Sequence, residues 1–142
     1  MARRKSSQAK SQAERSVGLA FTFDTGMLIA LERKDQSAWK AFKAITAREL
    51  VPVVPSAALP EWWRGRTDLR EEILAALVIE DLAPVIWKAA GEALGVVKGS
   101  TVVDAVVMAS ASLRGGGIVY TSDPKDLGLL QSRFPTVRVL DI

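Results

Sequence analysis

Residues 18–31, GLAFTFDTGMLIAL, decide the fold, because an apolar strand here runs into an aspartate and then into a helix. Leu19, Phe21 and Phe23 alternate with smaller residues, which is typical of a buried strand. A strand that feeds a helix forms the first half of a β-α-β unit, so a parallel sheet should follow. In such sheets the binding site lies beyond the carboxyl ends of the strands, where Asp24 falls.

The composition indicates one globular domain and excludes several kinds of chemistry. The chain has 142 residues, of which 49% are hydrophobic, enough for a single core. It contains neither cysteine nor histidine, which excludes disulfides, cysteine nucleophiles and mechanisms that need an imidazole. Prolines interrupt the apolar runs, and no cleavable signal sequence is evident. We therefore expect a cytoplasmic protein without a membrane segment.

The first 16 residues differ from the rest of the chain. They hold five basic residues, one acid and no large apolar side chain, so they carry a net charge of +4 where the whole chain carries +3. Such a segment cannot offset its ordering entropy by burial, and we expect a disordered basic arm that adds unspecific affinity for nucleic acid. Residues 17–142 form the predicted domain, whose net charge is −1.

Hydrophobic periodicity and turn residues predict strands and helices in alternation. The expected strands are 19–23, 50–54, 78–82, 118–121 and 137–140, and the expected helices are 24–31, 35–48, 56–64, 68–77, 84–94, 101–113 and 124–132. Asp35 or Ser37 should cap the second helix, and three glycines after Arg114 should end the helix 101–113. This order indicates a three-layer α/β/α fold with a central, mostly parallel sheet.

Two aspartates occur at helix starts where a cap and a ligand role are both open. Asp24 can accept a hydrogen bond from the backbone of the helix that it begins. Asp104 stands in the apolar stretch TVVDAVVMASAS, and with Thr101 it forms a capping-box pattern. A buried carboxylate without a partner costs several kcal/mol, so it must be neutralised, hydrogen-bonded or bound to a metal. A cap and a ligand role are compatible for both.

Three further carboxylates fall near the same edge of the predicted sheet. Asp123 follows the fourth strand and precedes Pro124, which also fits a helix cap, and Asp126 lies in the first turn of that helix. Glu61 follows Pro60, and the direction of its side chain depends on whether the helix starts at Ser56 or at Pro60.

Asp24, Glu61, Asp104 and Asp123, gathered without histidine or cysteine, would make an oxygen site suited to Mg²⁺ or Mn²⁺. Without a metal these groups repel one another, so at least one pKa should rise. The chemistry that needs such a site is phosphodiester hydrolysis by metal-activated water.

The sequence resembles the PIN-domain ribonucleases, particularly VapC-type toxins. The likeness rests on Asp24 in FDTGMLIALER, Glu61, Asp104 in VVDAVVMASA and Asp123 in YTSDPKDL, in this order and spacing, and it covers residues 19–142. It implies a five-stranded PIN-like sheet, Mg²⁺- or Mn²⁺-dependent cleavage of RNA with these four acids as catalytic metal ligands, a homodimer, and a small antitoxin that occludes the acidic cleft. Thr121 matches the hydroxyl residue that often accompanies the last acid.

Two positions depart from the family pattern. Many relatives have a serine or asparagine where this chain has Gly26, so that polar contact is missing or is supplied by Thr25 or Ser122. Pro60 directly before Glu61 is also unusual. These departures keep two alternatives open: an inactive PIN-fold interaction module, and a housekeeping RNA-processing nuclease.

Other folds with a strand-end aspartate fit less well. A haloacid-dehalogenase phosphatase needs a second acid at the position of Gly26, and a response regulator needs adjacent acids after its first strand. A phosphate-loop protein is also a poor fit, because the sequence around Lys98 lacks the required GxxxxGK order.

Two surfaces are predicted beside the carboxylates. Arg64, Arg66 and Arg70 either line the RNA path or form a solvated face. An antitoxin that inserts an arginine at the carboxylates also needs apolar anchorage. The docking surface that we expect for it is the aromatic group Trp39, Phe42, Trp62 and Trp63.

Overall fold

The computed structural model describes residues 21–142, so the predicted arm 1–16 and the beginning of the first strand lie outside the described residues. Five strands form one sheet in the order β3-β2-β1-β4-β5, and every neighbouring pair is parallel. They are β1 (Phe21–Phe23), β2 (Val53–Pro55), β3 (Val78–Glu80), β4 (Gly117–Thr121) and β5 (Val137–Asp141). The sheet predicted as mostly parallel is thus parallel throughout.

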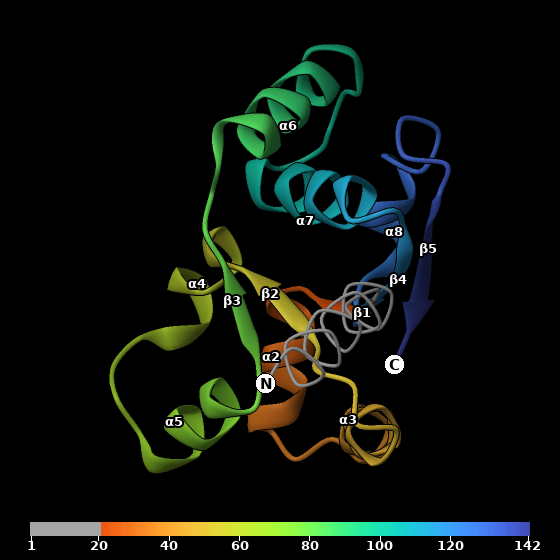
Figure 1. Ribbon diagram of the computed structural model, residues 1–142. Helices are drawn as coiled ribbons and strands as arrows, with labels where there is room; N and C mark the ends of the chain where they lie inside the picture. Colours follow the sequence, from red (N-terminus) through yellow and green to blue (C-terminus); the bar gives the residue numbers. More distant parts are fainter. Residues whose placement is uncertain (1–20) are drawn as a thin grey trace, which may run out of the picture.

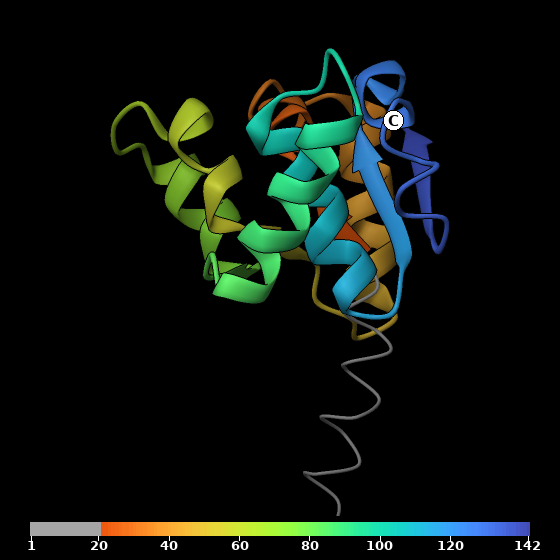
Figure 2. The same ribbon diagram turned by 90° about the horizontal axis from the view of Figure 1, so that it is seen from above.

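Helices cover both faces of the sheet, which gives three layers (Figure 1). One face carries α2 (Thr25–Glu32), α3 (Gln36–Ala47) and α5 (Asp68–Ala75). The other carries α7 (Val102–Leu113) and α8 (Pro124–Gly128), while α6 (Pro84–Val96) packs on the outer side of α7 (Figures 1 and 2). The short α4 (Pro60–Trp63) contacts α2. No helix within residues 21–142 is both long and apolar enough to cross a membrane.

Side-chain caps fix where the helices begin, as the sequence predicts. Asp24 accepts a hydrogen bond from the backbone N–H of Met27 at 2.8 Å, and Asp35 accepts one from Ala38 at 3.0 Å. Thr101 accepts one from the N–H of Asp104 at 3.1 Å. Each cap satisfies a backbone donor that the first turn leaves without a helical partner. The capping predictions for all three helices are confirmed.

The expected single helix 56–64 is divided in the structure. A 3₁₀ helix spans Ser56–Ala58, and α4 begins at Pro60. Proline has no N–H to donate and its ring crowds the preceding turn, so it stands at the first helical position rather than inside a longer helix. Of the two starts left open by the sequence, the one at Pro60 is correct. The helix predicted for 124–132 is also shorter and ends at Gly128.

A buried polar network fastens the end of α7 to the sheet. Arg114, which follows α7, donates to Glu80 and to Ser110 at 2.6 Å each, and also to the hydroxyl of Thr22. Ser110 donates to Glu80 in turn. Buried polar groups are stable when they are hydrogen-bonded, and this network holds α7 against β1 and β3. The opposite end of α7, which carries Asp104, is thereby held at the carboxyl edge of the strands.

Gly116→Ala should destabilise the protein more than Gly115→Ala, although both glycines have a left-handed backbone (φ +95° and +99°). A left-handed conformation costs an alanine about 1–2 kcal/mol. A Cβ at position 116 would lie 2.3 Å from the carbonyl oxygen of Thr136, whereas one at position 115 would meet nothing within 4 Å. We expect about 1–3 kcal/mol of additional destabilisation for Gly116→Ala. Urea unfolding of the two variants measures this difference, and equal stabilities would contradict it.

Candidate active site

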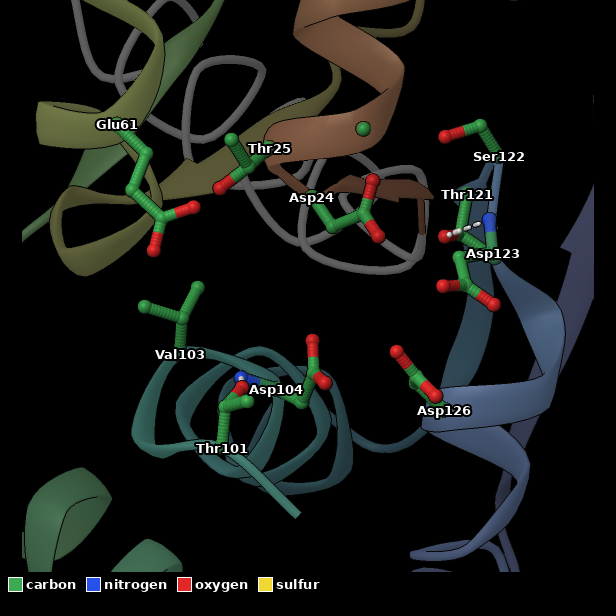
Figure 3. Close-up of a pocket in the computed structure, with 11 residues that line it drawn as sticks. Asp24, Thr25, Glu61, Thr101, Val103, Asp104, Thr121, Ser122, Asp123 and Asp126 are labelled. Carbon is green, nitrogen blue, oxygen red and sulfur yellow. Dashed lines mark hydrogen bonds between the residues drawn. The ribbon is translucent and has the colours of Figure 1, made fainter. Parts of the chain in front are cut away.

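A cavity of about 210 Å³ opens at the carboxyl edge of the sheet (Figure 3). It lies where the strand order reverses between β1 and β4, the usual place for a site in such sheets. The structure brings all eight predicted site residues to it: the lining residues are Asp24, Thr25, Gly26, Glu61, Thr101, Val103, Asp104, Thr121, Ser122, Asp123 and Asp126. Five of these are carboxylates, and none is a lysine or arginine.

Asp24 is the most deeply buried of these carboxylates, with 6% of its surface exposed. Burial raises its pKa from 3.8 to about 6, and the nearby charges of Asp104 and Asp123 contribute in the same direction. Hydrogen bonds from Thr121 and from the N–H of Met27 lower the pKa without offsetting burial. Asp24 is therefore a helix cap whose charged form is disfavoured. Its pKa rises as expected for at least one of these acids, but burial contributes more to the rise than repulsion does.

Asp104 enters the cavity from the first turn of α7. Its backbone N–H donates a hydrogen bond to the hydroxyl of Thr101, while its side chain points toward Asp24 (Figure 3). Burial is the main cause of its raised pKa, and the charges of Asp126, Asp123 and Glu61 add to it. The capping pattern and a ligand role are thus compatible, because the cap uses the backbone of Asp104 and leaves its carboxylate available.

Asp123 and Asp126 form a pair on the opposite wall. Asp123 precedes α8, but its side chain makes no capping hydrogen bond, and its N–H donates to Thr121 at 2.9 Å. The hydrogen bond and charge of Asp123 raise the pKa of Asp126. Asp126 therefore holds a proton more readily than an isolated aspartate does.

Glu61 and Thr25 lie across the cavity from that pair (Figure 3). Because α4 starts at Pro60, Glu61 falls in the first turn of this short helix. The hydroxyl of Thr25 donates to the carbonyl of Ala58 at 2.9 Å, which ties the start of α2 to the chain just before α4. This bond fixes the spacing between the wall that carries Glu61 and the one that carries Asp24.

Ser122 occupies the space where most side chains at position 26 would begin. A Cβ on Gly26 would lie 2.4 Å from the Oγ of Ser122 and 3.3 Å from the Oδ1 of Asp24. The hydroxyl of Thr25 is engaged with the backbone, so of the two substitutes that the sequence suggested, Ser122 is the better placed. Ser122 thus fills the space that the absent side chain of Gly26 leaves free.

The donor set fits Mg²⁺ or Mn²⁺ in chemistry, because it consists of oxygen atoms with no competing lysine or arginine on the wall. Within residues 21–142, however, no three acidic side chains lie close enough together to hold one ion as they stand. An ion held by three or more of these carboxylates therefore requires the side chains to move toward it. The raised pKa values of Asp24 and Asp104 show the repulsion and burial that a cation would relieve.

The arginines predicted for RNA binding do not line this cavity and are engaged elsewhere. Arg64 donates to the carbonyl of Glu61 at 3.0 Å. Arg70 pairs with Glu32 at 2.5 Å. Arg66 pairs with two acids of α5, Asp68 at 3.2 Å and Glu71 at 3.7 Å. Of the two interpretations, the structure gives more support to a solvated, ion-paired face, and the RNA-binding role stays a prediction.

The predicted aromatic docking surface is wrong for two of its four members. Phe42 and Trp62 are 7% and 2% exposed and belong to the hydrophobic core, so neither can anchor a partner. Trp39 and Trp63 are only partly buried, and the Nε1 of Trp39 donates to the carbonyl of Leu31. The sequence shows aromatic residues on two helices, α3 and α4, without showing which of them meet the core.

Comparisons with known proteins bear on the fold. No protein-family model matches the sequence, and no curated protein matches it. The structure is similar to a chain in the crystal structure of VapBC2 from Rickettsia felis bound to a DNA fragment from their promoter. The two share 15% sequence identity with a TM-score of 0.64, over 86% of this chain and 98% of the other. The three-layer PIN-like fold implied by the resemblance is thus confirmed.

Proposed function

We propose that this protein is a Mg²⁺- or Mn²⁺-dependent endoribonuclease and the toxin of a toxin–antitoxin pair. The observation that carries the proposal is the convergence of five carboxylates, from separate parts of the sequence, on one cavity at the switch point of a PIN-like sheet. Asp24, Glu61, Asp104 and Asp123 are the proposed catalytic metal ligands. The site chemistry and the fold support this assignment together, since fold alone does not imply function.

A bound divalent ion supplies a water that is activated near neutral pH and positive charge for the phosphate during in-line attack. The residues of the chain prepare the site for it. Thr121 holds two of the proposed ligands in position. Its side chain is hydrogen-bonded to the carboxylate of Asp24 and accepts a hydrogen bond from the backbone N–H of Asp123. The hydrogen bond and charge of Asp123 raise the pKa of Asp126, so a cation between them would favour the charged form of Asp126.

The proposal predicts RNA products with 5′-phosphate and 3′-hydroxyl ends. Attack by a metal-activated water does not use the 2′-hydroxyl, and the chain has no histidine for a cyclisation mechanism. End-group analysis of a metal-dependent digest by mass spectrometry makes the measurement. Cyclic 2′,3′-phosphate ends would show that the mechanism is wrong, and an absence of any digest would favour the inactive interaction module.

The proposal extends to the partners and the setting of the protein. We propose a cytoplasmic homodimer whose acidic cavity is covered by a small antitoxin. The similar solved chain belongs to the VapBC2 assembly, which supports a partner of this kind. An antitoxin arginine suits the cavity, because a planar guanidinium binds carboxylates through two parallel hydrogen bonds and the wall itself offers no cation.

A further inference from the structure

A second cavity, of about 230 Å³, adjoins the carboxylate cavity along the surface of α2. The two share Gly26 and Ser122 as a common wall. Its lining residues on α2 recur at helical spacing, so the cavity follows one face of that helix away from the acids. It is lined by Gly26, Ile29, Ala30, Arg33, Asp35 and Ser122.

The carboxylate cavity offers no basic side chain to an RNA strand, because its wall carries acids and neither lysine nor arginine. Phosphates are bound by lysine and arginine side chains, which supply most of the affinity for a nucleic-acid backbone. A cation must therefore lie beside the acids, within reach of a neighbouring phosphate. Of the two cavities, only the second has one, the guanidinium of Arg33.

Arg33 is available for this contact, unlike Arg64, Arg66 and Arg70. Its side chain is exposed at the end of α2, and it forms no ion pair with any residue in the described range 21–142. The one acid in the same cavity, Asp35, uses a carboxylate oxygen to cap α3 through the N–H of Ala38. The guanidinium can therefore face a ligand rather than a protein carboxylate.

Apolar surface lies between the acids and the arginine. Ile29 and Ala30 are half-buried and form the middle of the second cavity. This arrangement offers an apolar contact for a ribose or base, with a cation for its phosphate at the far end. It suits a nucleotide rather than a free ion, because an ion would need only the charged end.

We propose that the second cavity binds the nucleotide next to the scissile phosphate of a single-stranded RNA, with Arg33 holding its phosphate. The inference rests on the proposed function, since it takes the carboxylate cavity as the place of cleavage. The strand then passes over the shared wall of Gly26 and Ser122, where the hydroxyl of Ser122 occupies the space beside Gly26.

Fluorescence anisotropy of a labelled, single-stranded RNA of random sequence tests the contact. The Asp104→Asn protein in chelator prevents cleavage, and Arg33→Ala is compared with Arg48→Ala in that background. Arg48 is a matched control, because it is also exposed at a helix end and lines neither cavity. All proteins carry the same N-terminal segment, so its contribution cancels.

Arg33→Ala should weaken RNA binding by about tenfold, the expected loss of one charge-assisted phosphate contact. The slope of log affinity against log salt should fall by about 0.7, the value for one phosphate on a single strand. Arg33→Lys should restore most of the slope, since it keeps the charge, and Arg48→Ala should change neither quantity. Equal effects of Arg33→Ala and Arg48→Ala would overturn the proposal.

Single methylphosphonate substitutions on either side of the cleaved bond locate the contact. One neighbouring position should reduce cleavage by the wild-type protein yet add nothing to the effect of Arg33→Ala, because the two changes remove the same interaction. Additive effects at every neighbouring position would overturn the placement. RNA binding that depends on Arg33 but leads to no cleavage would contradict the proposed nuclease and support the RNA contact. Cleavage that Arg33→Ala leaves unchanged would support the nuclease and contradict the RNA contact.

Discussion

Asp24→Asn should abolish metal-dependent RNA cleavage and, in the same preparation, stabilise the metal-free protein at neutral pH. Loss of a catalytic metal ligand should reduce cleavage by about a thousandfold or more. Stability should rise because the carboxylate is buried against other acids, which raises its pKa to about 6. Asparagine keeps an oxygen that can accept the N–H of Met27, so the cap of α2 survives.

The sign of the stability effect follows from the pKa. Between 3.8 and about 6 the folded protein retains a proton on Asp24 that the unfolded chain has lost, so stability falls as the pH rises through this window. Above it the full penalty remains, at most about 3 kcal/mol for a shift of about two units. Asp24→Asn should therefore remove most of this pH dependence and raise Tm at pH 7 by up to about 10 °C.

Glu92→Gln is the matched control, since Glu92 is an exposed acid of α6 outside the cavity and its replacement changes the net charge equally. It should leave both the cleavage rate and the pH profile of Tm unchanged. Calorimetry in chelator across the acid-to-neutral range, beside a cleavage assay, gives both quantities. An Asp24→Asn protein that melts at a lower temperature than wild type at pH 7 would contradict this prediction, because it would show that the charged carboxylate stabilises the metal-free fold.

The parts of the fold that the sequence predicts well are those encoded by local chemistry. Asp24 and Thr101 cap helices through hydrogen bonds to residues three positions away, so their positions follow from short-range patterns. Parallel strands bring their carboxyl ends to one edge, and this places Asp123 near Asp24 without any knowledge of the packing. The division of the helix at Pro60 was one of two alternatives that the sequence left open.

The parts that it predicts poorly depend on which helix face meets the core. Trp62 is buried while its neighbour Trp63 is only partly so, and no pattern in a four-residue helix distinguishes them. The sequence leaves Arg70 open between the RNA path and a solvated face, because it does not show that Glu32 from another helix pairs with it. The sequence does not single out Arg33, because the cavity beside it exists only once α2 lies next to Ser122.

Millimolar Mn²⁺ or Mg²⁺ should raise the Tm of the wild-type protein. An ion that binds only the folded state at one hundred times its Kd adds about 2.7 kcal/mol, or roughly 8 °C for a chain of this size. No three acidic side chains in residues 21–142 are gathered closely enough to hold one ion together, so moving them toward a shared ion subtracts from the affinity. We therefore expect a response at millimolar rather than micromolar concentration.

The variant that separates specific binding from general screening of charge is Asp104→Asn. It removes one acid whose pKa is raised by burial and by the charges of its neighbours, so the metal-free variant should be at least as stable as wild type. Its response to Mn²⁺ should be small. Glu92→Gln should respond as fully as wild type, because screening of the whole surface acts on it alike. If wild type melts identically with metal and with chelator, the carboxylates do not form a metal site. If all three proteins respond equally, the ion acts elsewhere on the surface.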